Sequence, residues 1–564
     1  MFSKYHDHIN YECPMSEYPR PQMRRESYLC LNGTWTYLIK GKDRTLSGNA
    51  LVPFSLESEL GGGIDPLKKN ELLIMEREFV LPDLFNQGRV LLHLDGCDAS
   101  CDVFVNGQSV GTGDCGYLPV ICDITKALED VNHLKIIIRD PTEAGGQPRG
   151  KQSSSPKGIW YTAQSGLWQT VWLESVPEHY IESIKLTPHY DEHQVEILVR
   201  TNHSGTALVE CDGQTIECSV GLPSFLVLDH VHPWSVEDPY LYDLKIHFEQ
   251  DSIESYFGMR KFSIEEDEQG IKRLFLNNKP YFHTGVLDQG YMSDTLMSWP
   301  CDQAMIDDIM TAKSMGFNML RKHIKVEPLR WYYHCDRLGM LVWQDMVSGG
   351  GPYNKFTINL PLFTDIHYKD NIYWLFGRSS LMEREKFIRD LKGMIDHLYN
   401  VPSIAMWVIF NEGWGQFDVS KAYELVCSLD KTRTVIPCSG WHDQKIGNIR
   451  SWHVYFRPYK FKKDPLGRCV LLSEFGGYQL PVEGHLVNED PYGYKDIKDS
   501  THLENELKEL YEHQIIPAKE LGLSASVFTQ LTDVEREVNG LMTYDRHVLK
   551  INPDVMMKLN RQLY

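Results

Sequence analysis

The stretch Trp407-Val-Ile-Phe-Asn-Glu-Gly-Trp decides how this chain is interpreted. Its short apolar run ends in an Asn-Glu step and then breaks at glycine, which is typical of a barrel strand that delivers a charged side chain to the open end. A second stretch, Val470-Leu-Leu-Ser-Glu-Phe-Gly-Gly, repeats the pattern. If both strands belong to one barrel, Glu412 and Glu474 converge on a single reacting bond.

The region around both stretches alternates β-forming runs with amphipathic segments, which is typical of parallel α/β folds. We predict a (β/α)8 TIM barrel over residues 265–564, with Glu412 after the fourth strand and Glu474 after the seventh. The linker 347–380, rich in Gly, Pro and aromatic residues, is expected to shape the cleft. The predicted strands are 281–287, 317–323, 340–346, 404–411, 434–439, 450–455, 469–475 and 525–532; the predicted helices are 302–315, 327–338, 381–398, 419–429 and 503–519.

The part before residue 265 has the pattern of antiparallel β-structure. Short alternating segments such as 89–95, 101–105, 134–139 and 169–174 are separated by turn residues. The pattern restarts near residue 177. We therefore predict a β domain over 1–177 and an immunoglobulin-like β-sandwich over 178–264. The predicted sandwich strands are 180–186, 194–200, 206–211, 224–228 and 241–248.

Length and composition limit the class of protein. With 564 residues the chain can form several domains, and its net charge of -20 argues against a nucleic-acid partner, whose phosphates require a basic face. The first eight residues lack the apolar stretch of a signal peptide, and no apolar run reaches the roughly 20 residues that cross a bilayer. Thirteen cysteines without a Cys-x-x-Cys pair fit reduced thiols. We expect a cytoplasmic protein with no membrane partner.

Two carboxylates that face each other at a barrel mouth are the residues that a retaining glycosidase uses. One carboxylic acid protonates the leaving oxygen while the other carboxylate, about 5–5.5 Å away, attacks the anomeric carbon. We predict that Glu412 is the acid/base and Glu474 the nucleophile. Repulsion from Glu474 and partial burial beside Trp407 and Trp414 are expected to raise the pKa of Glu412. The alternative for either glutamate is a strand cap or the partner of a surface lysine.

Other side chains near the predicted strand ends are candidates for substrate binding. Asn411 is expected to bond the sugar 2-hydroxyl, Arg321 to keep Glu474 ionised, and Tyr455 to orient Glu474. Structural roles are the alternative, such as an Arg321–Asp345 ion pair or an indole packed in the core. The candidate set is Arg321, His323, Asp345, Asn411, Trp414, Trp441, His453, Tyr455 and Arg457.

Distinctive motifs occur along nearly the whole chain: Leu31-Asn-Gly-Thr-Trp, Phe104-Val-Asn-Gly, Ser165-Gly-Leu-Trp-Gln-Thr-Val-Trp-Leu-Glu, Tyr256-Phe-Gly-Met-Arg-Lys, Gly285-Val-Leu-Asp-Gln-Gly-Tyr, Asn318-Met-Leu-Arg-Lys-His, Asn411-Glu and Ser473-Glu-Phe. Together they resemble glycoside hydrolase family 2, the group that contains β-galactosidases, β-glucuronidases and β-mannosidases. The resemblance implies an N-terminal jelly roll, an immunoglobulin-like sandwich and a catalytic TIM barrel, with retaining hydrolysis through a glycosyl-enzyme intermediate. It places the acid/base on Glu412 and the nucleophile on Glu474. The chain ends soon after the barrel, so the longer β-galactosidase architecture is not expected.

Two substrate hypotheses remain open. Relatives that bind glucuronides resemble one another in an Asn-x-Lys step near the end of the barrel, but this chain has Val538-Asn-Gly-Leu-Met there, without the lysine. Arg457, Lys460, Lys462 and Lys463 follow the sixth strand, where they form either a solvated loop or an attractive surface for a uronic acid such as galacturonate. We rank a terminal β-galactoside, cleaved by an exo-acting enzyme, first and a β-uronide (galacturonide or glucuronide) second.

A non-catalytic carbohydrate-binding protein of the same fold is the alternative from another class, and the two glutamates argue against it. The sequence predicts a carbohydrate partner, no organic cofactor and a homo-oligomer, and it contains no metal-ligand cluster specific enough to name. Trp160, Trp168 and the loop 145–158 could reach the barrel mouth, although packing between domains is the simpler interpretation.

Overall fold

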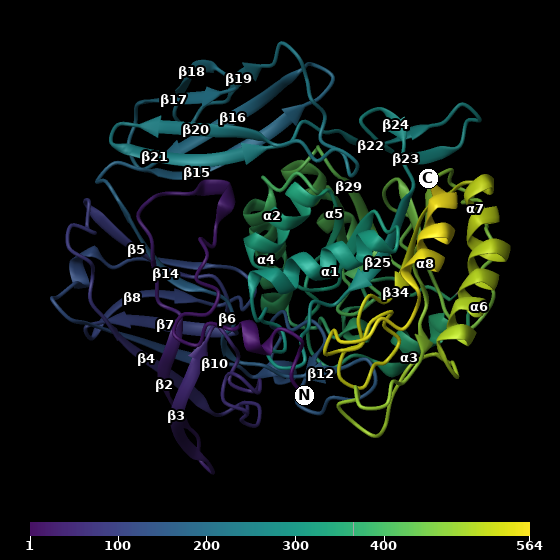
Figure 1. Cartoon of the computed structure of the whole chain (residues 1–564), viewed down its shortest axis with the longest axis horizontal. Helices are drawn as coiled ribbons and strands as arrows, with labels where there is room; N and C mark the ends of the chain where they lie inside the picture. Colours follow the sequence, from purple (N-terminus) through teal and green to yellow (C-terminus); the bar gives the residue numbers. More distant parts are fainter. Residues whose placement is uncertain (365) are drawn as a thin grey trace.

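The computed structural model of the chain describes residues 1–364 and 366–564, so one position of the predicted linker 347–380 lies outside the described residues. Two antiparallel β-sandwiches are followed by a parallel α/β barrel (Figure 1). This architecture confirms the predicted fold class. No helix in the described part of the chain is long and apolar enough to span a bilayer.

The N-terminal part is a sandwich of two antiparallel sheets. Burial alternates along strands such as β2, so each sheet turns one apolar face inward. The shared core includes Trp35, Ile136 and Leu173. One sheet has the order β1 (Leu29–Cys30), β14 (Val171–Val176), β5 (Arg89–Leu94), β9 (Val120–Asp123); the other has the order β3 (Thr45–Val52), β2 (Gly33–Lys40), β4 (Leu72–Phe79), β10 (Asn132–Arg139), β7 (Ser100–Val105), β8 (Gln108–Gly113).

The second part is the immunoglobulin-like sandwich, which lies at the top of Figure 1. It contains two strands that the sequence pattern did not predict, β18 (Gln214–Ser219) and β21 (Asp251–Phe257), and both are edge strands. Only one residue of β18 is buried, which explains why its apolar signal is weak. One of its sheets has the order β15 (Ile181–His189), β16 (Gln194–Thr201), β19 (Ser224–Val227). The other has the order β18 (Gln214–Ser219), β17 (Thr206–Cys211), β20 (Tyr242–Phe248), β21 (Asp251–Phe257).

A short three-stranded sheet links this sandwich to the barrel. It consists of β22 (Phe262–Glu266), β23 (Lys272–Leu276) and β24 (Lys279–Pro280), so the boundary expected between residues 264 and 265 falls inside β22. Phe262 and Leu274 share a hydrophobic core with Trp343 of the barrel. The sheet therefore covers the N-terminal end of the barrel and leaves the opposite end for the site.

Eight parallel strands form the barrel in chain order, and β29 lies beside β30 to close the ring. All eight predicted strands are present. The predicted helix 503–519 is interrupted by a π-helical turn, Tyr511–Ile515, just before a proline in the first turn of α7. The strands are β25 (His283–Asp288), β26 (Met319–Lys322), β27 (Leu341–Asp345), β28 (Ile404–Asn411), β29 (Thr434–Ser439), β30 (Ile449–Val454), β31 (Cys469–Gly476) and β34 (Leu523–Thr529); the helices are α1 (Asp302–Ser314), α2 (Leu329–Leu338), α3 (Lys355–Asn359), α4 (Leu381–Leu398), α5 (Val419–Leu429), α6 (Ser500–Leu510), α7 (Ile516–Leu521) and α8 (Pro553–Asn560).

Candidate active site

The C-terminal ends of the barrel strands bring most of the candidate residues together. Arg321 lies near the end of β26, Asp345 ends β27 and Asn411 ends β28, while His453 and Glu474 lie near the ends of β30 and β31. These five residues are all buried. Because parallel strands end on the same side of the barrel, residues distant in sequence meet there.

Glu412 and Glu474 form the centre of this cluster. A carboxylate oxygen of each lies within 4.8 Å of the other and of a His453 ring nitrogen. The nearest oxygens of the two carboxylates are therefore no farther apart than the roughly 5–5.5 Å between the carboxyl groups of retaining glycosidases. Glu412 has φ 49°, in the left-handed region that residues other than glycine rarely adopt. Its amide donates to the carbonyl of Ser439 at 2.9 Å, and this contact helps to hold the strained residue in place.

Glu474 lies among hydrogen-bond donors. Its Oε1 accepts a bond from Arg321 Nη1 at 3.0 Å, and its Oε2 accepts one from the Tyr455 hydroxyl. The Tyr455 hydroxyl also lies 3.1 Å from Thr529 Oγ1, which fixes its position. A carboxylate that receives a guanidinium and a phenol is stabilised in its charged form.

Glu412 has the opposite environment. Burial is the largest cause that raises its pKa to about 7, and Glu537 raises it further, whereas Lys151 and Arg321 lower it. The pKa of Glu412 is therefore raised, as predicted, but the carboxylate that repels it is Glu537 rather than Glu474. Trp407, expected beside Glu412, instead donates through Nε1 to Asp430 at 2.8 Å.

His453 connects the two glutamates. Its Nδ1 lies 2.7 Å from Glu412 Oε1 and 3.5 Å from Glu474 Oε2, and its Nε2 lies 2.9 Å from Ser439 Oγ. Burial lowers the pKa of His453 to about 4, so the ring is neutral near pH 7. A ring protonated on Nε2 donates to Ser439 and accepts at Nδ1 the proton of Glu412. In this tautomer His453 favours the protonated form of Glu412.

Arg321 organises the polar residues around Glu474. Its Nε and Nη2 donate to both oxygens of Asp345 at 3.0 and 2.9 Å, and Nη2 also donates to Asn411 Oδ1 at 2.9 Å. His323 Nδ1 lies 3.0 Å from Asp345 Oδ2. Asp345 therefore holds Arg321 and His323. Asn411 Nδ2 is buried and has no hydrogen-bond partner among the described residues, so it is available to a hydroxyl of a bound sugar.

Aromatic side chains form one wall of the site. Trp414 packs on Trp160 from the N-terminal sandwich at a ring distance of 5.2 Å, and Trp160 stacks in turn with Tyr353 at 6.2 Å. Trp160 thus reaches the barrel mouth, whereas Trp168 is buried and donates to Gly116 within the sandwich. Trp441 lies 6.3 Å from the His453 ring.

The basic loop after β30 lies at the surface. Arg457 lines a shallow cleft with Tyr494 and Glu506. A second cleft contains Arg457 together with Lys460 and Lys462, all of which are exposed. Of the candidate residues, Arg457 is thus the one placed at the outer rim rather than in the buried cluster.

Residues from the N-terminal domain complete the site. The sequence analysis allowed that the loop 145–158 reaches the barrel mouth but preferred packing between domains, and it did not name Lys151 as a candidate. Arg149 and Gly150 donate backbone bonds to Ser348 at 2.9 and 3.0 Å, which anchors their loop to the barrel. The loop buries Lys151, whose Nζ lies 3.8 Å from Glu537 and 3.5 Å from the Tyr161 hydroxyl. A buried lysine is unusual, and no pattern in the sequence distinguishes Lys151 from Lys157, the exposed lysine of the same loop.

Two groups among the described residues have spacing that could hold a cation. One consists of Glu412, His453 and Glu474, whose direct hydrogen bonds satisfy them without an ion. The other, His179, His203 and Glu249, lies at the surface of the immunoglobulin-like sandwich. Stacked imidazoles at 3.9 Å do not direct two lone pairs at one point, so this second group is poorly arranged for a metal.

A TIM barrel with paired glutamates at strand ends, preceded by two β-sandwiches, defines a multidomain glycosidase. The chain belongs to glycoside hydrolase family 2, in agreement with the motifs quoted above. Family models match residues 68–170 (glycosyl hydrolase 2 galactose-binding domain-like), 179–260 (glycosyl hydrolases family 2) and 269–467 (glycosyl hydrolases family 2, TIM barrel domain).

The chain is similar to glycosidases that are named for different substrates. A protein from Formosa agariphila named as a candidate β-glucuronidase is 24% identical, and the match covers 68% of this chain and 46% of that protein. A β-galactosidase from Streptococcus thermophilus is 23% identical, and the match covers 66% of this chain and 36% of that protein. The chain thus spans less than half the length of these relatives. A β-galacturonidase from Eisenbergiella tayi bound to galacturonate has a TM-score of 0.72 at 20% identity, with 98% of this chain and 99% of that chain covered. This likeness shows the shared fold.

Proposed function

We propose that this protein is a retaining exo-β-glycosidase that cleaves a terminal β-linked sugar through a covalent glycosyl-enzyme intermediate. The observation that carries the proposal is the pair Glu412 and Glu474, whose oxygens lie within 4.8 Å of each other in opposite environments. Glu474 attacks the anomeric carbon while Glu412 protonates the leaving oxygen. Glu412 then removes a proton from water, the water oxygen attacks the anomeric carbon and displaces the Glu474 carboxylate, and the sugar leaves with its original configuration.

The surrounding residues support this division of roles. Arg321 and Tyr455 donate to Glu474 and favour the ionised nucleophile, whereas burial and neutral His453 favour the protonated acid. Asn411 can donate its unpaired Nδ2–H to the sugar 2-hydroxyl, an interaction that strengthens in the transition state. The loop that carries Lys151 is anchored to the barrel at Ser348, and we infer that it closes one side of the site, which would favour a terminal sugar over an internal one.

The test is the configuration of the first product, followed by proton NMR during hydrolysis of a panel of nitrophenyl glycosides. The β-anomer must appear first and convert later to the α-anomer. Direct appearance of the α-anomer would contradict the proposal, and sugar binding without turnover on any glycoside would support a carbohydrate-binding protein instead.

A β-galactoside is the leading substrate, as in the β-galactosidase relatives. The basic loop after β30 lies at the surface, and Glu537 balances part of the Lys151 charge in the pocket. A β-uronide is the second candidate because Glu537 is already bound by Tyr161 at 2.5 Å and Asn539 at 3.0 Å, while Lys151 reaches it only at 3.8 Å. The Lys151 ammonium is therefore able to receive a sugar carboxylate.

Replacement of Lys151 by methionine separates these two substrates. If the ammonium binds a uronate, kcat/KM for the nitrophenyl uronide falls by about 10- to 100-fold relative to the galactoside, since a charged hydrogen bond is worth about 1.5–3 kcal/mol. Loss of the cation also raises the pKa of Glu412, so the alkaline limb of the pH profile moves to higher pH for every substrate. Lys157→Met, an exposed lysine on the same loop, is the matched control. An unchanged ratio of the two substrates excludes Lys151 as the uronate ligand.

A further inference from the structure

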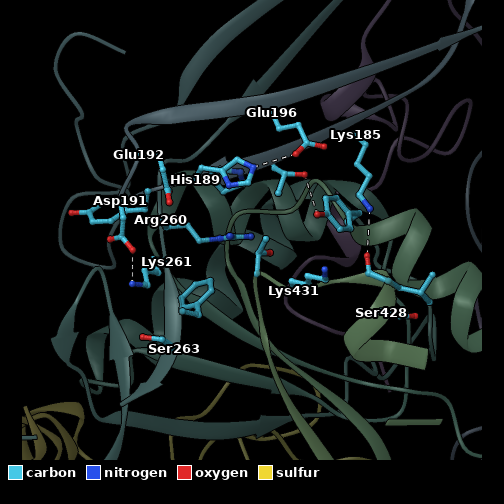
Figure 2. Close-up of a pocket in the computed structure, with 17 residues that line it drawn as sticks. Lys185, His189, Asp191, Glu192, Glu196, Arg260, Lys261, Ser263, Ser428 and Lys431 are labelled. Atoms are coloured by element: carbon cyan, nitrogen blue, oxygen red, sulfur yellow. Dashed lines mark hydrogen bonds and ion pairs between the residues drawn. The ribbon is translucent and has the colours of Figure 1, made fainter. Parts of the chain in front are cut away.

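A second cleft, of about 610 Å³, lies between the immunoglobulin-like sandwich and the N-terminal end of the barrel. Its walls come from the end of β15, the segment Arg260 to Ser263, Tyr399 before β28, and the turn after α5 (Figure 2). At about 3.3 Å per residue, the eight residues of β28 separate this end of the barrel from Glu412 by roughly 25 Å. The cleft is therefore distinct from the candidate active site.

Arg260 is the central feature of this cleft. It is 2% exposed, and its side chain extends toward the middle of the cleft (Figure 2). Nε donates to the carbonyl of Pro402 at 3.2 Å, but Nη1 has no hydrogen-bond partner among the described residues. Asp430, the carboxylate that raises the pKa of Arg260 most, is already bound by Arg433 at 2.8 Å and by the Trp407 indole.

This arrangement leaves a buried guanidinium without an anion. Burial, with a contribution from Arg433, lowers the pKa of Arg260 to about 9. A buried cation without a partner is costly, and an anion that reached it would remove this cost.

Three lysines and three acidic side chains line the rest of the cleft, so the cleft owes its excess positive charge to Arg260. Lys185 donates to the carbonyl of Leu429 at 3.3 Å, and Lys431 is exposed at the rim. In Figure 2 both lysines lie to the right of Arg260, opposite Asp191 and Glu192. Two of the acidic side chains are paired with neighbours in the cleft, since Asp191 pairs with Lys261 at 2.6 Å and Glu196 with His189 at 3.2 Å. Glu192 is exposed at the outer rim.

We propose that this cleft binds a small oxyanion, a phosphate or a carboxylate group, with Arg260 as the principal ligand and Lys185 and Lys431 as flanking cations. The planar guanidinium suits the oxygens of either group. Residues of the sandwich and of the barrel contact the same anion, so the ligand stabilises the junction between them. The site does not depend on the proposed glycosidase activity.

The experiment is a titration of the full-length protein with inorganic phosphate at constant ionic strength, followed by the phosphorus-31 line width and the thermal midpoint. The wild type is expected to broaden the line saturably and to gain about 2 °C or more at saturation. Arg260→Gln abolishes both effects, and Lys431→Glu weakens them several-fold. A parallel titration with acetate, read by the thermal midpoint, shows whether a carboxylate is preferred.

Lys421→Glu is the matched control because it makes the same charge change at the opposite end of α5, on an exposed residue. It should bind phosphate like the wild type. If Arg260→Gln does not fold, Lys431→Glu still tests the site, because its lysine is exposed. Equal stabilisation of the wild type and both cleft variants by phosphate, or no effect of either anion on the wild type, overturns the proposal.

Discussion

Replacement of Glu474 by alanine is expected to lower kcat/KM on every hydrolysed nitrophenyl glycoside by at least about 10⁴-fold, because removal of a nucleophile eliminates the covalent step. The fold should survive. Arg321 keeps its two bonds to Asp345 and its bond to Asn411. The measurement is steady-state turnover, with the thermal midpoint as the check on folding.

Azide provides a sharper readout of the same variant. A small anion can occupy the space left by the Glu474 carboxylate and attack from that face, so Glu474→Ala with azide should form an α-glycosyl azide. Glu520→Gln, an exposed acidic residue on α7, is the control and should retain full activity. Wild-type turnover in Glu474→Ala without azide would exclude Glu474 as the nucleophile.

Replacement of Glu412 by glutamine should produce an effect that depends on the leaving group. Poor leaving groups such as alkyl glycosides need the proton and should lose about 10³- to 10⁴-fold, the range of general acid catalysis. With nitrophenyl glycosides the variant should form the intermediate readily but hydrolyse it slowly. Both kcat and KM should therefore fall, and a burst of nitrophenol should precede the steady state. Azide then attacks the intermediate and gives a β-glycosyl azide, the opposite configuration to that from Glu474→Ala.

The pH profile provides a second test of Glu412. Because burial raises its pKa to about 7, the wild type holds the catalytic proton below pH 7 and loses it above, so kcat/KM should decline as the pH rises through about 7. In Glu412→Gln this alkaline limb should disappear. An unchanged limb, or an equal loss for good and poor leaving groups, would contradict the acid/base role.

Much of the fold was readable in the sequence because each barrel strand is an apolar run that ends in polar residues, and the helices between the strands keep a regular apolar spacing. Helices α4 and α5 match their predicted bounds residue for residue. The edge strand β18 was missed because only one of its residues is buried and its alternation is weak. The edge strand β21 was also missed, although five of its seven residues are buried. The interruption of the last predicted helix by a π-helical turn was also not visible in the apolar spacing.

The amino-acid sequence by itself determined the order of the three domains, the barrel and the two glutamates, because periodicity and strand-end motifs are local properties of the chain. Only the tertiary structure decided which charged and polar groups surround the two glutamates. It showed that Glu537 rather than Glu474 adds to the raised pKa of Glu412, and that His453 lies between the two carboxylates. It also brought Lys151 close to Glu537 and left Arg260 Nη1, in a distant cleft, without a hydrogen-bond partner among the described residues. Charges act through space and burial, and neither follows from spacing along the chain.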